Sequence, residues 1–588
     1  MDALNRTDKK GTPEISEAAW QRIRARLVYL YGEEQADALV ARIAVIAHNH
    51  VEHRPIRRTG ALWSQKDVCL ITYGDSVQNP SERPLETLGK FLHENLKDLV
   101  TTVHILPFYP SSSDGGFSVV DYQTVDPDLG GWPDIHTISE DFDIMFDFVL
   151  NHVSRESLWF TDFLEHIAPG KDYFIEIDPR ENLSTVVRPR TSPLLVKIEA
   201  RHETRHVWAT FSHDQIDLNY ANPDVLVAML KTLLFYVRNG ARAVRLDAVA
   251  FLWKEIGTSC IHLPQTHEIV KLFRDVLGEL EPSCVLLTET NVPHHENISY
   301  FGDGDEAHAV YQFALPPLLL QAIISGCTRH LRDWAASLEP LPPNCTYFNF
   351  TASHDGIGLR ALENMIPRAA EDELVDAMRQ RGGFVSSRLS EEGKEVPYEL
   401  NISYFDAMGG PDADTWQIPR FLLSQTVALS LQGVPGIYVL SLLATPNDLQ
   451  GVERTGQTRS INRRKWDCRE LEELLADPMT AHAQVFSELR RRLEVRREQS
   501  AFHPNADQRI VYLYTPLFCI LRESRETGQR IFCLFNFTAT PVELPKSALG
   551  VTADVNFIDL LDETPGWMVK GQITLPAYAT RWLTPTSA

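Results

Sequence analysis

The chain has 588 residues, of which 44% are hydrophobic and 23% charged, a composition typical of a soluble protein with a large core. Its net charge is −23 and it contains no run of basic residues, which argues against binding to nucleic acid or to an anionic membrane. A bound phosphate or carboxylate would therefore need arginines close by. The eight cysteines are scattered without a CxxC pair, which favours reduced thiols over a disulfide frame or a zinc site.

The first sixty residues predict a helical extension. In residues 14–50, apolar side chains such as Trp20, Ile23 and Leu27 recur at helical spacing, which indicates two short helices packed on the main body. We interpret the histidine-rich segment 48–53 as a helix end rather than a metal cluster, because no other ligand type lies nearby at metal spacing. The polar N-terminus lacks the apolar core of a signal peptide, which predicts a cytoplasmic protein.

From Asp67 onward, short apolar runs that end in polar residues alternate with helix-like segments. Strands that alternate with helices indicate a parallel sheet, and eight strands are the number that closes a (β/α)8 TIM barrel. The predicted strands lie at 67–75, 99–110, 142–152, 241–248, 284–291, 307–315, 345–353 and 434–443. Long insertions follow the third and seventh strands, and such insertions commonly form lids or substrate walls.

The predicted fold is α/β: a (β/α)8 TIM barrel with inserted B domains, an N-terminal helical extension and a C-terminal antiparallel β domain. Short strands split by turn residues near the end of the chain indicate this last domain. The boundaries are 1–60 for the helical extension, 61–154, 222–355 and 416–495 for the catalytic barrel, 155–221 for domain B, 356–415 for the inserted region B′ and 496–588 for the β domain.

Four predicted strands end in polar residues that a structural role alone would not require. They carry Asp147, Asn151 and His152 (third strand), Arg245 and Asp247 (fourth), Glu289 (fifth), and His354 and Asp355 (seventh). Any one of these is as readily a helix cap or a solvated loop residue. However, the C-terminal ends of barrel strands meet at one face, so three carboxylates converge there, as expected of an active site.

The motifs DFVLNH, GARAVRLDAVAF, LLTETN and FTASHDG closely resemble, in the right order, the four signature regions of the α-amylase superfamily of glycoside hydrolases. The resemblance covers about residues 60–490. It implies Asp247 as nucleophile, Glu289 as general acid/base, Asp355 as stabiliser of the distorted sugar, and Arg245, His152 and His354 as residues that hold the glucosyl ring.

The chemistry of a retaining glycosidase agrees with these roles. One ionised carboxylate attacks the anomeric carbon and one protonated carboxyl group protonates the leaving oxygen. We expect Arg245 to keep Asp247 ionised by charge attraction, and burial near other carboxylates to raise the pKa of Glu289.

Within the superfamily, the chain is similar to the sucrose phosphorylase group. This resemblance implies that Asp114 grips the sugar hydroxyls, that Arg459 also holds the sugar, that Phe117 and Phe160 line the acceptor side, and that Arg190 (in RPR) and Tyr398 (in PYELN) contact phosphate. Glu399 is a further predicted substrate contact.

Two departures from the pattern of the sucrose phosphorylases argue against sucrose as the substrate. Glu399 stands where sucrose phosphorylases have glutamine, and Val396 stands where they have an acidic residue that contacts fructose. Valine cannot hydrogen-bond fructose, and a lost polar contact costs roughly 1–3 kcal/mol. Together with the helical extension, these departures resemble the phosphorylases of glucosylglycerol and glucosylglycerate.

The sequence therefore predicts a retaining glucoside phosphorylase whose partners are a small glucoside and inorganic phosphate. 2-O-α-Glucosylglycerol is favoured, because a glycerate carboxylate would need a further basic residue and only Arg201 and Arg205 suggest themselves. The alternatives, in order, are a glucosylglycerate phosphorylase, a sucrose phosphorylase and a hydrolase or transglucosidase. A binding protein without activity is opposed by the three intact carboxylates.

No cofactor and no metal are expected, although Asn151 lies where calcium-binding amylases place a ligand. The segment with Cys260, His262 and His267 predicts a loop and helix start rather than a zinc site. A homodimer is one option for the assembly.

Overall fold

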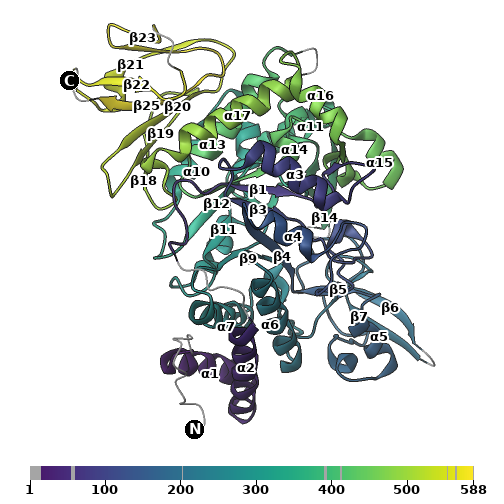
Figure 1. Ribbon diagram of the computed structural model, residues 1–588. Coiled ribbons are helices and arrows are strands. Elements are labelled where there is room, and N and C mark those ends of the chain that lie inside the picture. The colour runs from purple at the N-terminus through teal and green to yellow at the C-terminus, as the bar shows by residue number, and fades with distance from the viewer. Residues whose placement is uncertain are drawn as a thin grey trace.

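The protein forms a closed barrel of eight parallel strands surrounded by helices (Figure 1). The computed structural model describes residues 15–53, 60–200, 203–389, 394–410, 414–552, 554–562 and 566–586. The barrel strands are β1 (Cys69–Thr72), β3 (Thr102–Ile105), β4 (Asp143–Val149), β9 (Ala241–Asp247), β10 (Val285–Thr288), β11 (Ala309–Tyr311), β12 (Thr346–Phe350) and β16 (Val434–Tyr438). Each predicted strand contains one of them, so the predicted barrel is confirmed.

The barrel helices bury apolar side chains, and three of them begin with a proline in the first turn. Proline occupies the first turn of α3 (Pro84–Leu96), α6 (Pro223–Arg238) and α7 (Pro264–Leu280), where its missing N–H costs no hydrogen bond. The other outer helices are α4 (Trp132–Ile138), α8 (His294–Ile298), α9 (Leu315–Ser325), α10 (Arg329–Ser337), α12 (Tyr404–Ala407), α13 (Gln417–Ser430), α14 (Val439–Leu442), α15 (Leu449–Thr455), α16 (Cys468–Ala476) and α17 (Ala481–Arg497).

Domain B is a small unit inserted after β4. It contains β5 (His152–Ser154), α5 (Leu158–Glu165), β6 (Leu195–Ala200), β7 (Glu203–Trp208) and β8 (Gln215–Asp217). Strand β5 pairs with β8, and β6 pairs with β7. The pairing of β5 shows that the insertion begins at His152, slightly before the predicted boundary.

The second insertion is a hairpin with a helix. It contains β13 (Ile357–Gly358), α11 (Arg368–Gln380), β14 (Phe384–Leu389) and β15 (Glu395–Asn401), with strand order β13-β15-β14. Strand β13 directly follows the turn that carries Asp355, so this sheet is tied to the end of β12.

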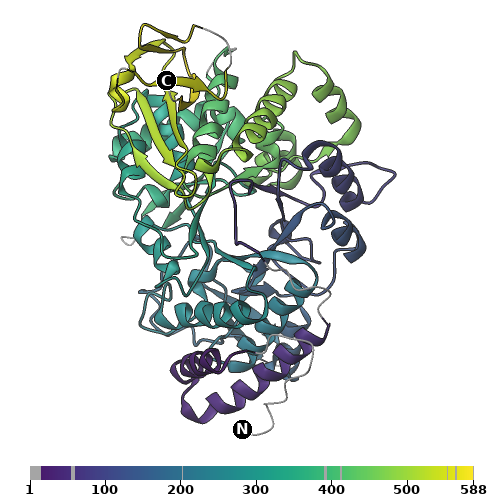
Figure 2. The same ribbon diagram turned by 60° about the vertical axis from the view of Figure 1, so that its left-hand side comes forward.

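The N-terminal extension is a helical hairpin of α1 (Glu17–Tyr31) and α2 (Glu33–His53). It packs on α6 and α7 at the end of the molecule opposite the C-terminal sheets (Figures 1 and 2). Arg26 forms ion pairs with Asp275 and Glu268 of α7. His50 is buried against Glu281, with 3.1 Å between Nε2 and Oε1. The predicted helices are confirmed, and this histidine serves the contact between hairpin and barrel.

The chain ends in two antiparallel sheets. One has the order β18-β19-β20-β25-β22 and the other β21-β24-β23. Their strands are β18 (Asp507–Ile510), β19 (Leu517–Glu523), β20 (Arg530–Asn536), β21 (Val542–Pro545), β22 (Asn556–Asp559), β23 (Met568–Val569), β24 (Gln572–Leu575) and β25 (Thr580–Thr586). A separate pair of short strands, β2 (Val77–Gln78) and β17 (Trp466–Asp467), lies outside these sheets. Trp582 donates a hydrogen bond of 2.8 Å to the hydroxyl of Ser430 on α13, which joins this domain to the barrel. Among the described helices, none has the length and apolar character to cross a membrane.

Candidate active site

The three predicted catalytic carboxylates lie together at the C-terminal end of the barrel. Asp247 is the last residue of β9, and Glu289 follows β10 directly. The backbone N–H of Ala248 donates to Oε2 of Glu289 at 3.1 Å, so Glu289 lies beside the residue that follows Asp247. Arg245 Nη1 lies 2.8 Å from Asp247 Oδ1, and its Nη2 lies 3.9 Å from Glu289 Oε2.

Burial dominates the charge state of this pair. It raises the pKa of Asp247 well above the usual range, and Arg245 opposes this shift without outweighing it. The pKa of Glu289 is also raised, again mainly by burial. The expectation for Glu289 therefore agrees with the structure, whereas Arg245 alone does not keep the pKa of Asp247 low. Arg245 lies closer to Asp247 than to Glu289, so its charge favours the ionised form of Asp247 more strongly than that of Glu289.

Arg245 is itself anchored by a second carboxylate. It forms an ion pair with Asp147 of β4, and Asp147 Oδ2 lies 2.7 Å from His104 Nε2 of β3. Burial would raise the pKa of Asp147, but Arg245 and His104 together bring it to about 2. Asp147 was predicted at the end of its strand without a role, and His104 was not predicted. The available signal was a polar residue in each of two neighbouring buried strands.

Asp355 is held by Arg459, with 2.7 Å between Asp355 Oδ1 and Nη1. Burial would raise the pKa of Asp355, but Arg459 and His354 outweigh it and lower the pKa. Arg459 also binds both carboxylate oxygens of Glu399, at 2.9 and 2.6 Å. Glu399 is therefore an anchor for Arg459 in this structure, and it ties the second insertion to the site.

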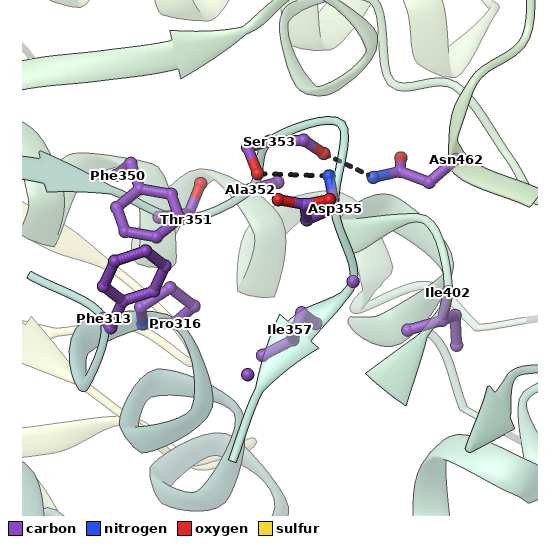
Figure 3. A pocket seen from close by; sticks show the side chains of 12 residues that line it. Phe313, Pro316, Phe350, Thr351, Ala352, Ser353, Asp355, Ile357, Ile402 and Asn462 are labelled. Carbon is purple, nitrogen blue, oxygen red and sulfur yellow. Dashed lines mark hydrogen bonds between the residues drawn. The ribbon is translucent and has the colours of Figure 1, made fainter. Parts of the chain in front are cut away.

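The turn that carries Asp355 is braced by two hydrogen bonds (Figure 3). The backbone N–H of Asp355 donates to the hydroxyl of Ser353 at 3.3 Å, and the amide of Asn462 donates to the carbonyl of Ser353 at 2.7 Å. A cavity of about 10 Å³ lies beside this turn and reaches Phe313 and Ile402, which is room for about one water molecule. The turn is therefore held from two sides.

Two neutral histidines form the predicted sugar-binding wall, and Phe117, which was predicted to line the acceptor side, packs against them. The ring of Phe117 stacks on His354 with 4.6 Å between centroids, and the carbonyl of Phe117 lies 3.0 Å from His152 Nε2. Burial lowers the pKa of His152 and brings that of His354 to about 3. Both imidazoles are neutral at pH 7, so they can hydrogen-bond uncharged hydroxyl groups.

Asp114 reaches this wall on a loop that requires glycine. Gly116 has φ of +104°, and a Cβ atom there would lie 2.6 Å from the carbonyl oxygen of Pro107. Any other residue would push the loop away from the barrel. Asp114 Oδ2 accepts a hydrogen bond from Gln215 at 3.3 Å, and Oδ1 lies 3.9 Å from Arg459.

The two predicted phosphate contacts lie together, although they are about two hundred residues apart in the chain. The guanidinium carbon of Arg190, from domain B, lies 5.3 Å from the ring centre of Tyr398 on β15 and 6.0 Å from that of Phe211. Burial raises the pKa of Tyr398, and the charge of Arg190 opposes the shift. The two insertions therefore meet at this pair.

Two other predicted residues are buried inside domain B. Phe160 is 1% exposed and packs on Phe163 and Phe174 inside domain B. Arg205 is also buried; it donates to the carbonyl of Phe163 and bonds His166. It therefore does not offer the site a free cation, and Arg201 lies outside the described residues.

The junction of barrel and domain B contains a lysine ammonium. Lys254 Nζ lies 2.8 Å from Asn151 Oδ1 and 2.7 Å from Asp217 Oδ2. Burial lowers the pKa of Lys254, and Asp217 opposes the shift. The chain itself thus supplies a cation next to Asn151. In the described part of the chain, no group of three or more His, Cys, Asp or Glu side chains could hold a metal ion; His262 and His267 instead contact Tyr300 and Glu306.

Comparison with known proteins places this site in a family. Residues 94–339 match the α-amylase catalytic domain. The chain is 47% identical over 535 residues to a glucosylglycerate phosphorylase of Allomeiothermus silvanus, covering 90% of this chain and 94% of the relative. It is 30% identical over 425 residues to a glucosylglycerol phosphorylase of Marinobacter adhaerens, covering 70% and 84%.

A solved structure gives the same result. The crystal structure of sucrose 6F-phosphate phosphorylase from Thermoanaerobacter thermosaccharolyticum superimposes with a TM-score of 0.70 at 27% identity, covering 80% of this chain and 94% of that one. The chain therefore belongs to the α-amylase family and, within it, to the group of glycosyl-transferring phosphorylases.

Proposed function

We propose that this protein is a retaining phosphorylase that converts 2-O-α-glucosylglycerate and phosphate into α-glucose 1-phosphate and glycerate. From the sequence, glucosylglycerol was the favoured substrate and glucosylglycerate the first alternative. The order is reversed here, because the glucosylglycerate phosphorylase relative is 47% identical and the glucosylglycerol phosphorylase relative 30% identical. The observation that carries the proposal is Arg190, which lies over the ring of Tyr398 and forms no ion pair with a carboxylate of the described residues.

In the first step, Asp247 attacks the anomeric carbon while Glu289 gives its proton to the glycosidic oxygen. The carbon–oxygen bond breaks, glycerate leaves, and an ester joins glucose to Asp247. The raised pKa of Glu289 suits it to donate this proton near neutral pH. Asp355, Asp114 and the two neutral histidines would hold the hydroxyl groups of the sugar.

In the second step, an oxygen of phosphate attacks the same carbon and the ester breaks. Glu289, now ionised, accepts the proton of the attacking phosphate, and Asp247 returns as carboxylate. Two displacements restore the original configuration. No cofactor or metal is needed for either step in this scheme.

The test is product analysis with purified protein and three substrates: 2-O-α-glucosylglycerate, 2-O-α-glucosylglycerol and sucrose, each with and without phosphate. We expect α-glucose 1-phosphate only when phosphate is present, formed fastest from glucosylglycerate. Free glucose released at the same rate without phosphate would instead identify a hydrolase. Faster reaction of one of the other two glucosides would correct the acceptor but leave the phosphorylase mechanism intact.

A further inference from the structure

The arginines of the candidate site differ in whether they form ion pairs with carboxylates of the protein. Arg245 lies between Asp147 and Asp247, and Arg459 lies between Asp355 and Glu399. Arg190 forms no ion pair with any carboxylate of the described residues, and the hydroxyl of Tyr398 has no hydrogen-bond partner among them. In a protein of net charge −23, a half-buried arginine without a carboxylate partner indicates a site for an anion from solution.

The position of Arg190 links it to the reacting groups. Its neighbour Phe211 lies 5.4 Å from the ring of His152, which belongs to the sugar-binding wall. Its other neighbour, Tyr398, directly precedes Glu399 in β15, and the charge of Glu289 contributes to the raised pKa of Tyr398. Arg190 therefore lies next to one residue that contacts the sugar-binding wall and next to another that is close enough to Glu289 to be affected by its charge.

The stereochemistry of the reaction constrains where the two co-substrates bind. Retention means that the acceptor oxygen leaves, and the phosphate oxygen arrives, on the same face of the anomeric carbon. Both oxygens therefore pass through one position beside Glu289. With glycerate as acceptor, both molecules bring a negative charge to that position, although they occupy it at different times.

We propose that Arg190 and the hydroxyl of Tyr398 form one anion site that binds the carboxylate of glycerate and the phosphate in turn. The inference rests on the proposed phosphorylase function and adds the residue that selects the acceptor. A guanidinium presents two parallel N–H groups that fit a carboxylate and a phosphate equally well. A neutral polyol such as glycerol gains no ion pair there, so the same arginine favours glycerate over glycerol.

The experiment uses α-glucosyl fluoride as donor, because fluoride leaves without occupying the anion site. Glucosyl transfer to phosphate, to glycerate and to glycerol is measured for the wild type, Arg190→Ala, Arg190→Lys and a control, Arg155→Ala, which removes one exposed positive charge of domain B. For Arg190→Ala we expect kcat/KM to fall about 10- to 100-fold for both phosphate and glycerate. We expect changes of less than about threefold for glycerol, for fluoride release without acceptor, and for the control.

The lysine variant and a competition assay sharpen the result. Arg190→Lys keeps the charge but loses the paired N–H groups, so it should recover only part of both anion-dependent rates. Phosphate should inhibit transfer to glycerate competitively in the wild type.

Three outcomes would overturn the inference. A loss for phosphate alone would give glycerate a separate site, while the proposed function would stand. An equal loss for glycerol and for fluoride release would show that Arg190 maintains the shape of the site. A wild type that transfers glucose to phosphate and glycerol but not to glycerate would refute the proposed substrate, and the shared anion site with it.

Discussion

The two halves of the candidate site differ in whether their arginines are paired with carboxylates of the protein. On the donor side, Arg245 and Arg459 are each held between two carboxylates of the chain. On the proposed acceptor side, Arg190 lies over the rings of Tyr398 and Phe211 and forms no ion pair with a carboxylate of the described residues. In the proposed function, the balanced charges on the donor side suit a sugar without net charge, and Arg190 suits an anion on the acceptor side.

This difference follows from what each half must bind. A neutral sugar offers only hydroxyl groups, so the charges around it must be balanced within the protein, and fixed pairs of this kind stay oriented while charge develops in the transition state. An anion brings its own charge, so the cation that receives it must not already be neutralised. Mutations can test each half separately.

The largest expected effect is the loss of Asp247. Asp247→Ala should lower kcat by about 10⁵- to 10⁶-fold, because no other group of the cluster is placed to form the ester with glucose. Rates of phosphorolysis and a melting curve would check this. A folded variant that keeps normal activity would refute the proposed nucleophile.

The second effect concerns the proton on Glu289. Glu289→Gln should slow the phosphorolysis of glucosylglycerate by about 10²- to 10⁴-fold. Fluoride release from α-glucosyl fluoride should fall much less, because fluoride needs little protonation to leave. Equal losses on the two substrates would count against Glu289 as the acid.

The third prediction concerns the ion pair of Lys254 and Asp217 between the barrel and domain B. Lys254→Met leaves Asp217, which is fully buried, without its cation, and breaking such a pair should lower the free energy of unfolding by about 3–5 kcal/mol. The matched control is Lys197→Met, because Lys197 pairs with Glu199 on the surface of domain B with both side chains more than half exposed. There we expect a change within about 0.5 kcal/mol.

Removal of metal completes this test. Because Lys254 bonds both Asn151 and Asp217, we expect wild-type protein treated with EDTA to keep its activity and its melting temperature. A loss that calcium restores would show that a metal ion, rather than Lys254 alone, stabilises the junction.

The smallest predicted effect is the pH dependence of stability from Asp147. Its pKa of about 2 in the folded protein lies below the ordinary value of 3.8, so its contribution is complete above pH 3.8 and is lost as the pH falls toward 2. At 1.36 kcal/mol per unit of pKa, this amounts to about 2 kcal/mol. Urea unfolding between pH 5 and 2 should show a decline for the wild type that is steeper by this amount than for Asp147→Asn. The exposed Asp172→Asn should behave as the wild type does.

The sequence was sufficient to predict the barrel and the meeting of its carboxylates. Asp247, Glu289 and Asp355 each follow an apolar run, and parallel strands in a barrel bring their C-terminal ends to one face. The strands β21, β22, β23 and β24 were not predicted because, unlike the equally short barrel strands, they do not lie within longer apolar runs.

The partners of each charge could not be predicted in the same way. Arg245 pairs with Asp147 across 98 residues, and Arg459 pairs with Glu399 across 60. The first pair joins the neighbouring strands β4 and β9, and the second joins β15 of the second insertion to a segment beyond α15, so neither leaves a local pattern in the sequence. For the same reason Arg205 was a reasonable candidate for the acceptor site, yet it lies buried against Phe163 and His166.

The helical hairpin at the start of the chain has a consequence for synthesis on the ribosome. Its buried residues, such as Ile23, Leu27 and Ile43, are covered in part by α6 and α7, and α7 ends at Leu280. At translation rates of 5–20 residues per second, α7 emerges roughly 10–50 s after the hairpin. Until α6 and α7 have emerged, α1 and α2 lack these partners, so part of their apolar face stays exposed to water and to chaperones. Completion of α7 therefore marks the moment at which the beginning of this chain can reach its final place.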